Sequence, residues 1–178
     1  NAASLIVTGN AAPTATITAP AAGALYAAGD TISYAGAGSG PKDGNLPPAS
    51  LTWTMVFHHD THTHPFLGPL SGASGSFVIP RTGETSANVF YRLHLDVRDS
   101  GGLTRSTQVD IRPRTATLTL ASTPSGLQLT LDGQPVTASY TFEAVVGMTR
   151  TLGVISPQTL RRKQYGFMSW SDGGAGTH

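Results

Sequence analysis

Short runs in which apolar and polar residues alternate constrain the fold of this chain more than any other feature. The clearest run covers residues 91–97 (YRLHLDV), where every second residue is apolar or aromatic. A period of two is typical of a β-strand that buries one face. Further short runs of strand-forming residues lie between turn residues and cover residues 14–18, 31–35, 51–57, 77–79 and 106–111. These runs predict an all-β fold.

The composition favours the same fold class. Charged residues make up 12% of the 178-residue chain, which contains 21 Gly and 12 Pro, and lysine occurs at positions 42 and 163 alone. A chain poor in helix-forming surface residues and rich in turn residues is most simply all-β.

Charge and cysteine content exclude several classes of function. The formal net charge is +1, so no strong field attracts nucleic acid or an anionic membrane surface. No apolar run reaches the about 18 residues that a membrane-spanning helix needs. The absence of cysteine excludes disulfides, thiol catalysis and cysteine-ligated metals. We therefore expect neither a nucleic acid nor a membrane as a partner.

The composition changes at Arg112-Pro113-Arg114, which we interpret as a hinge. We expect residues 1–12 to be a linker, residues 13–113 to form an immunoglobulin-like β-sandwich, and residues 114–178 to form a small β-domain. In the small domain, strands are predicted over residues 115–120, 127–131, 140–142, 149–154 and 165–170.

Alternation also predicts the sandwich core. Trp53, Met55 and Phe57 share one face of their strand. In an immunoglobulin-like sandwich this strand pairs with the strand over residues 91–97. The inward residues of that second strand are Tyr91, Leu93, Leu95 and Val97. Between the strands, residues 36–48 and 58–76 are expected to be long loops.

Several segments carry a family resemblance. They are Pro20 with Gly23, AGD at 28–30, KDGNL at 42–46, LTW at 51–53 and LDVRDSGGL at 95–103. In these segments the first domain resembles the polycystic-kidney-disease-type (PKD-type) immunoglobulin-like modules of secreted bacterial proteins, and HHDTHTHP at 58–65 is similar to a histidine-bearing subgroup. The second domain, with TPSGL at 123–127 and FMSWSDGG at 167–174, resembles the small β-module that follows there.

The pair of modules is similar to the C-terminal accessory regions of secreted bacterial pyrroloquinoline-quinone sugar dehydrogenases and related carbohydrate-active proteins. The resemblance implies a secreted, extracellular and non-catalytic accessory module. It would bind a glycan or polysaccharide beside a parent enzyme domain of the same polypeptide. Two alternatives stay open: a transition-metal-binding module centred on residues 58–64, and a purely structural spacer.

Calcium fits the chain less well than a transition metal does. Members of the family often carry acidic residues where Gly40 and Lys42 stand in this sequence. Calcium needs several oxygen ligands, and this turn keeps Asp43 and Asn45.

The histidines define a candidate metal site. By alternation, His58 and His94 project from the outer face of the same predicted sheet, while His62 and His64 share one side of an extended loop. Because imidazole nitrogens suit zinc and copper, we expect one such ion to be bound by His58, His94 and at least one of His62 and His64. The alternative is a polar loop held together by histidine hydrogen bonds.

Neighbouring residues complete this candidate site. Asp60 and Asp96 are candidates to orient a histidine ring or to ligate the ion. His59 faces away from His58 by alternation, so we expect it to hydrogen-bond the loop backbone instead. The chain shows no nucleophile elbow and has two glutamates, Glu84 and Glu143. We therefore expect no catalytic residues and no enzyme activity.

The second domain contains a candidate ligand site of its own. Tyr165 and Trp170, with Phe167 between them and Asp172 close by, are suited to stack on a sugar ring and hydrogen-bond its hydroxyls. The alternative is that Trp170 belongs to the core of the small domain. The basic run at 161–163 is expected to be a solvated turn.

Overall fold

The computed structural model describes residues 11–178, so most of the predicted linker over residues 1–12 lies outside the described part of the chain. The chain divides into two compact units. The first comprises the described residues up to Tyr26, together with Asp30–Ile79 and Asn88–Pro113, and the second comprises Ala27–Gly29, Pro80–Ala87 and Arg114–His178. Within residues 11–178 no helix is long and apolar enough to cross a membrane.

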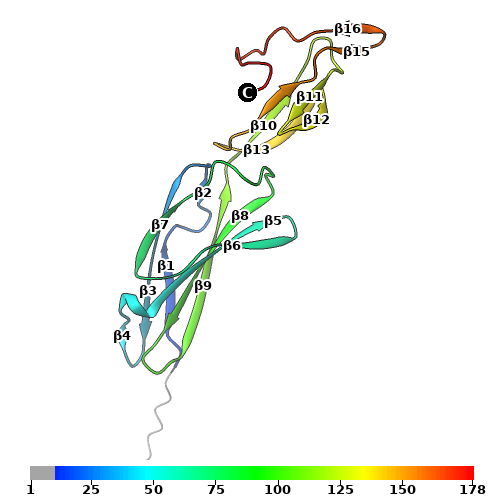
Figure 1. Ribbon diagram of the computed structural model, residues 1–178. Coiled ribbons are helices and arrows are strands. Elements are labelled where there is room, and N and C mark those ends of the chain that lie inside the picture. Colours follow the sequence, from blue (N-terminus) through cyan, green and yellow to red (C-terminus); the bar gives the residue numbers. More distant parts are fainter. Residues whose placement is uncertain (1–10) are drawn as a thin grey trace, which may run out of the picture. The chain divides into compact units, whose positions relative to one another are not determined.

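The N-terminal unit contains two sheets, which Figure 1 shows in blue to green. The first sheet consists of β1 (Thr14–Ala19), β3 (Thr31–Gly40), β4 (Gly44–Asn45) and β7 (Ser74–Val78). The second has the order β2-β9-β8-β5-β6, with β2 at Leu25–Tyr26, β9 at Thr104–Pro113, β8 at Val89–Arg98, β5 at Leu51–His59 and β6 at His62–Ser71. A short 3-10 turn, η1 (Pro48–Ser50), precedes β5.

The two sheets of this unit bury their facing side chains against each other, which makes the unit a β-sandwich. The Tyr34 ring on β3 lies 4.8 Å from the Trp53 ring on β5, measured between ring centroids. Trp53 is 2% exposed, and its indole N–H donates a hydrogen bond to the Gly72 carbonyl at 2.8 Å. The remaining buried side chains of β5 and β8 are Leu51, Met55, Val89, Tyr91, Leu93, Leu95 and Val97.

The predicted strand faces are confirmed along β5 and β8. Every predicted inward residue of these strands is buried except Phe57, which is half-buried and packs on Tyr91 with 4.9 Å between ring centroids. Phe57 lies near the end of β5, where the strand continues beyond the buried part of the sheet. The all-β fold class is likewise confirmed, because the described residues form no α-helix.

Both predicted long loops contain strands that the sequence interpretation missed. Residues 36–40 continue β3, and residues 62–71 form β6. Glycine is needed in the first of these because β3 passes close over the core. A Cβ atom on Gly36 would lie 2.7 Å from Leu95 Cδ2 and 2.9 Å from Trp53 Cη2. Glycine in this strand therefore marks close packing and not a turn.

The C-terminal unit contains three small sheets, drawn in yellow-green to red in Figure 1. One pairs β10 (Thr115–Leu120) with β13 (Tyr140–Val145), and another has the order β12-β11-β14, with β12 at Gln134–Thr137, β11 at Gln128–Leu131 and β14 at Leu152–Val154. The third is the hairpin of β15 (Gln158–Leu160) and β16 (Lys163–Tyr165). Leu129 and Leu131 of β11, with Ala144 and Val145 of β13, are buried.

The end of this unit differs from the prediction. The predicted strand over residues 165–170 ends at Tyr165, and residues 166–170 are irregular. Two adjacent hydrogen bonds, 2.8 and 3.0 Å long, join the backbones of His178 and Leu152 instead. Arg161 and Arg162 form the exposed turn of the β15–β16 hairpin, as predicted, whereas Lys163, the third residue of the predicted turn, begins β16.

Candidate functional site

The tip of the β5–β6 hairpin gathers three histidines. In the antiparallel pairing, His59 lies opposite His62, and Phe57 lies opposite His64. Opposite residues of such a pair share a face of the sheet, and so do residues two apart on one strand. His59, His62 and His64 therefore project from one face, the face that carries Trp53 and Met55 further along β5.

The three rings lie close enough together to hold one metal ion. Each ring offers one nitrogen, and these three atoms lie within 4.8 Å of one another. The Nε2 atoms of His59 and His64 are 2.9 Å apart and share a hydrogen bond, in which one ring donates and the other accepts. The His62 ring meets the His59 ring edge-on, with 4.0 Å between centroids.

Contacts on either side fix the position of the hairpin tip. The turn residue Asp60 has a φ of +46°, in the left-handed region that aspartate tolerates. The Asn88 side-chain amide donates to Asp60 Oδ1 at 3.1 Å, and the Asp60 backbone amide donates to the Asn88 carbonyl at 3.3 Å. The His59 ring stacks on Phe57 with 5.9 Å between centroids. Asp60 therefore anchors the turn to Asn88 through its carboxylate and its backbone amide.

The structure places His58 on the opposite face of the sheet. Its ring stacks on Phe90, with 4.2 Å between centroids, and the Arg92 and Arg112 guanidiniums also lie against the Phe90 ring. Burial, together with the nearby Arg92 charge, lowers the pKa of His58. His58 therefore belongs to an aromatic and basic cluster and does not meet His62 or His64.

His94 also lies away from the hairpin tip. On β8 it pairs with Thr54, whereas His58 pairs with Phe90, so the two histidines are separated by four positions along the sheet. That separation is about 13 Å along the backbone at the usual rise per residue, and neither histidine belongs to the group of described residues whose ligand atoms converge. Asp96, further along β8, accepts a hydrogen bond from the Ser106 hydroxyl. The predicted ligand set of His58 and His94 with a loop histidine is thus not brought together.

His59 is the residue of this cluster that the sequence interpretation left out. Alternation correctly turned His59 away from His58, but the partner strand β6 was taken as a loop. A two-residue turn at Asp60-Thr61 brings His62 and His64 onto the face of His59. The available signal was the i, i+2 spacing of His62 and His64, which is the period of a strand.

The C-terminal unit contains a groove of about 710 Å³. Leu120, Leu129 and Leu152 contribute apolar lining from three different strands. All four residues of the second candidate site also line the groove: Tyr165, Phe167, Trp170 and Asp172. Trp170 is half-buried, so it is neither a fully buried core residue nor a freely exposed one.

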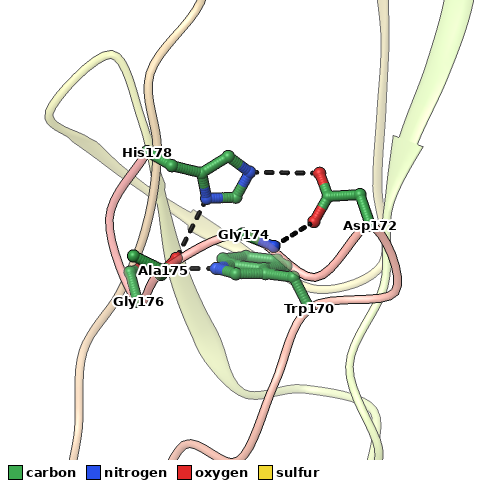
Figure 2. A network of polar contacts seen from close by, with 6 residues as sticks. All are labelled: Trp170, Asp172, Gly174, Ala175, Gly176 and His178. Carbon is green, nitrogen blue, oxygen red and sulfur yellow. Dashed lines mark hydrogen bonds and ion pairs between the residues drawn. The ribbon is translucent and has the colours of Figure 1, made fainter.

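A polar network holds the chain around Trp170 and Asp172 in place, as Figure 2 shows. The Trp170 indole N–H donates to the Gly176 carbonyl at 3.4 Å. The Asp172 carboxylate accepts the Gly174 amide at 3.0 Å and His178 Nε2 at 3.1 Å, and these two contacts lower the pKa of Asp172. The other His178 ring nitrogen lies 3.0 Å from the Ala175 carbonyl oxygen. The loop that forms one side of the groove is therefore held in place by hydrogen bonds.

The acidic turn that the family resemblance associates with calcium makes protein contacts. The Ser100 hydroxyl and backbone amide lie 2.5 and 3.1 Å from the two carboxylate oxygens of Asp43 and donate to them. These hydrogen bonds, the hydroxyl's above all, lower the pKa of Asp43. The carboxylate thus links this turn to the turn after β8.

Comparisons with known proteins assign no family to the chain. No protein-family model matches it, and neither the curated proteins nor the solved structures gave a significant match. The two groups of residues described above are therefore the structural observations from which a function can be argued.

Proposed function

We propose that this chain is a non-catalytic, carbohydrate-binding accessory module of a secreted carbohydrate-active protein, with a PKD-type immunoglobulin-like sandwich as its first domain. The groove of the C-terminal unit is the observation that carries the proposal. The carbohydrate class, the secreted location and the parent enzyme domain rest on the resemblance of the sequence segments.

The groove has the size and lining that a small ligand needs. Its volume of about 710 Å³ lies within the usual range for ligand sites, about 300–1,000 Å³. Phe167 is 36% exposed, so part of its ring is open to a ligand. The Phe167 and Trp170 ring centroids are 5.9 Å apart, and the ring planes meet at 54°. Two tilted rings offer adjoining apolar surfaces against which a sugar ring can stack.

Polar groups at the groove provide hydrogen-bonding partners for hydroxyls. Asp172 is exposed, and an aspartate is ionised at neutral pH, so its carboxylate oxygens accept hydrogen bonds. The Gln158 side chain is fixed by its hydrogen bonds to the Gln128 backbone amide (2.7 Å) and carbonyl (3.0 Å) and to the Ile155 carbonyl (2.8 Å), so its Oε1 atom is the one that can accept a further hydrogen bond. A groove with apolar walls and a few oriented polar groups is typical of ligand sites, and a sugar presents both kinds of surface.

Polysaccharide binding with a matched pair of variants tests this proposal. The whole chain is applied to a glycan array at neutral pH, with and without a chelator, and the hits are quantified by calorimetry. We expect Phe167→Ala to weaken glycan binding about tenfold, because a well-placed ring contact contributes about 1.5 kcal/mol. Tyr140→Ala is the control, because Tyr140 is similarly exposed (39%) but does not line the groove.

Two results would count against glycan binding at the groove. One is an array without hits, which favours the structural spacer. The other is an equal loss of affinity in the Phe167 and Tyr140 variants, which places binding elsewhere on the unit. Circular dichroism of both variants establishes that each retains its fold.

A further inference from the structure

We propose that the tip of the β5–β6 hairpin is a transition-metal site in which His59, His62 and His64 bind one zinc or copper ion. This site lies in the N-terminal unit and is independent of the proposed glycan function, whose residues lie in the C-terminal unit.

The three histidines are a suitable ligand set for such an ion. Three imidazoles suit zinc and copper, and a site with three protein ligands leaves one position for water or an outside donor. Around tetrahedral zinc, with bonds of about 2.0–2.1 Å, two ligand nitrogens stand about 3.3 Å apart. The His59 and His64 Nε2 atoms are already 2.9 Å apart. The third nitrogen lies within 4.8 Å of both, so side-chain rotation alone can close the site.

The strand register makes this arrangement a property of the fold. The pairs His59–His62 and Phe57–His64 bring the three rings to one face without any rearrangement of the backbone. The Asp60–Asn88 contacts tie the turn to the residue before β8, and the stack on Phe57 limits the motion of the His59 ring. Groups that hold a ligand ring in place raise metal affinity, because less freedom is lost on binding.

The three histidines are accessible to a metal ion from solvent. His62 and His64 are exposed, and His59 is half-buried beside them. A metal can therefore reach the tip from solvent. The two exposed ligands can be replaced without disturbing the sandwich core, which is what a clean test requires.

Zinc titration of the whole chain by isothermal calorimetry tests the site. We expect one zinc ion per chain, and we expect His62→Gln and His64→Gln each to weaken zinc binding at least about tenfold. His59→Gln should do the same, with circular dichroism showing that the hairpin unit stays folded. Zinc should also raise the melting temperature of the parent chain and not that of these variants.

Three other histidine variants serve as controls. His58→Gln and His94→Gln remove the histidines on the opposite face, and His178→Gln removes the ring beside Asp172. All three should bind zinc as the parent does. The proposal is overturned if the parent gives no saturable zinc binding, if the triad variants bind like the parent, or if a control variant loses binding instead.

A measurement on the unaltered chain gives independent evidence. In long-range ¹H–¹⁵N spectra of the histidine rings, zinc should shift the resonances of three rings, assigned to His59, His62 and His64, and leave those of His58 and His94 in place. A competition titration between zinc and copper shows which of the two ions the site prefers, and tighter copper binding is expected for nitrogen ligands. Shifts confined to other rings would refute the assignment.

Discussion

The two units of this chain bury their aromatic residues to very different extents. In the N-terminal unit five aromatic side chains are at most 7% exposed: Tyr26, Tyr34, Trp53, Phe77 and Tyr91. Among residues 114–178, all of which the structure describes, no aromatic side chain is buried. Their five aromatic residues are half-buried or exposed, and three of them line the groove.

Sheet size accounts for this difference. The N-terminal unit packs a five-stranded sheet against a four-stranded one, whereas the sheets of the C-terminal unit have two or three strands. A small unit has too much surface for its volume to enclose a large ring on every side. Trp53 is therefore a core residue of the N-terminal unit, whereas Trp170 lines the groove of the C-terminal unit. In this chain the size of the surrounding sheet, more than the residue type, determines whether an aromatic side chain is accessible to a ligand.

Replacing each tryptophan by alanine is the strongest test of this contrast. Trp53→Ala should destabilise the N-terminal unit by about 3–5 kcal/mol, because it empties a fully enclosed site. Trp170→Ala should destabilise the C-terminal unit by about 2 kcal/mol, because the side chain is only partly buried and less area is lost than at Trp53. Chemical denaturation followed by circular dichroism measures both losses.

Fluorescence assigns each loss to a unit. The chain has two tryptophans, so each variant keeps one as a reporter of the other unit. Trp170 emission in Trp53→Ala follows the C-terminal unit, and Trp53 emission in Trp170→Ala follows the N-terminal unit. Equal losses for the two substitutions would remove the distinction between core and groove.

Overpacking the enclosed unit should have the next largest effect. Gly36→Ala places a methyl group 2.7 Å from Leu95 Cδ2, so the core must shift, and we expect a loss of about 1–3 kcal/mol. Gly40→Ala on the same strand is the control. Its Cβ would lie 3.7 Å from the nearest heavy atom, Asp43 Oδ2, so its effect should stay within about 0.5 kcal/mol. Urea denaturation separates the two, and equal effects would show that the sheets can move apart freely.

The same contrast explains how much of the fold the sequence could predict. Along β5 and β8, strict alternation identifies the buried face, because these long strands have one face in the core and the other outside. Along β3 the pattern fails after Ala35, because Gly36 and Gly38 carry no side chain to alternate. Their role depends on Val97 and Leu95 of the other sheet, which no local pattern reveals.

The histidine cluster was predictable in part for a related reason. The sequence shows that His62 and His64 share a side and that His58 and His59 do not. Whether His58 or His59 lies beside His62 and His64 depends on where the chain turns. A turn at Asp60-Thr61 lacks the Asn-Gly or Asp-Gly pair that marks a two-residue hairpin, so the register of β6 was not visible. The residues Tyr165, Phe167, Trp170 and Asp172 were easier to group, because they lie close together in the sequence, whereas the groove lining from other strands was not predicted.

A smaller effect on stability is expected when the pH is lowered. Arg92 donates to both oxygens of Asp110, at 2.7 and 2.9 Å, which lowers the pKa of Asp110. A depressed carboxylate pKa stabilises the fold above the unfolded value, about 3.9, and this contribution is lost as pH falls through the folded value. Asp110→Asn should therefore cost about 1 kcal/mol at pH 7, and the difference from the parent should shrink between about pH 5 and pH 3.

The C-terminal unit has a corresponding pair. Burial raises the pKa of Asp132, but hydrogen bonds from Arg150 and the Thr151 amide outweigh it, so the pKa of Asp132 is lowered overall. Asp132→Asn should therefore destabilise the C-terminal unit at neutral pH and lose this effect as the pH falls through the folded pKa, as Asp110→Asn does in the N-terminal unit. Denaturation curves at several pH values measure both differences. A difference that stays constant from pH 7 to pH 3 would refute the assigned role of either pair.

The smallest expected effect is a gain in stability in the C-terminal unit. The β15–β16 turn places Arg161 and Arg162 at φ values of +49° and +65°, a region that disfavours side chains other than Asn, Asp and Gly. Asn-Gly is the usual pair in a two-residue turn with two positive φ values. The double substitution Arg161→Asn with Arg162→Gly should therefore stabilise the C-terminal unit by about 0.5–1 kcal/mol.

The control for this substitution separates backbone conformation from charge. Arg161→Gln with Arg162→Gln removes both charges but keeps two ordinary side chains in the left-handed region, so it should not stabilise the unit. Urea denaturation in a Trp53→Phe background follows the C-terminal unit through Trp170 alone. If the Gln pair stabilises the unit as much as the Asn-Gly pair, the gain comes from lost charge repulsion. If the Asn-Gly pair alone stabilises it, backbone conformation at this turn limits the stability of the small unit, which has few buried side chains to offset it.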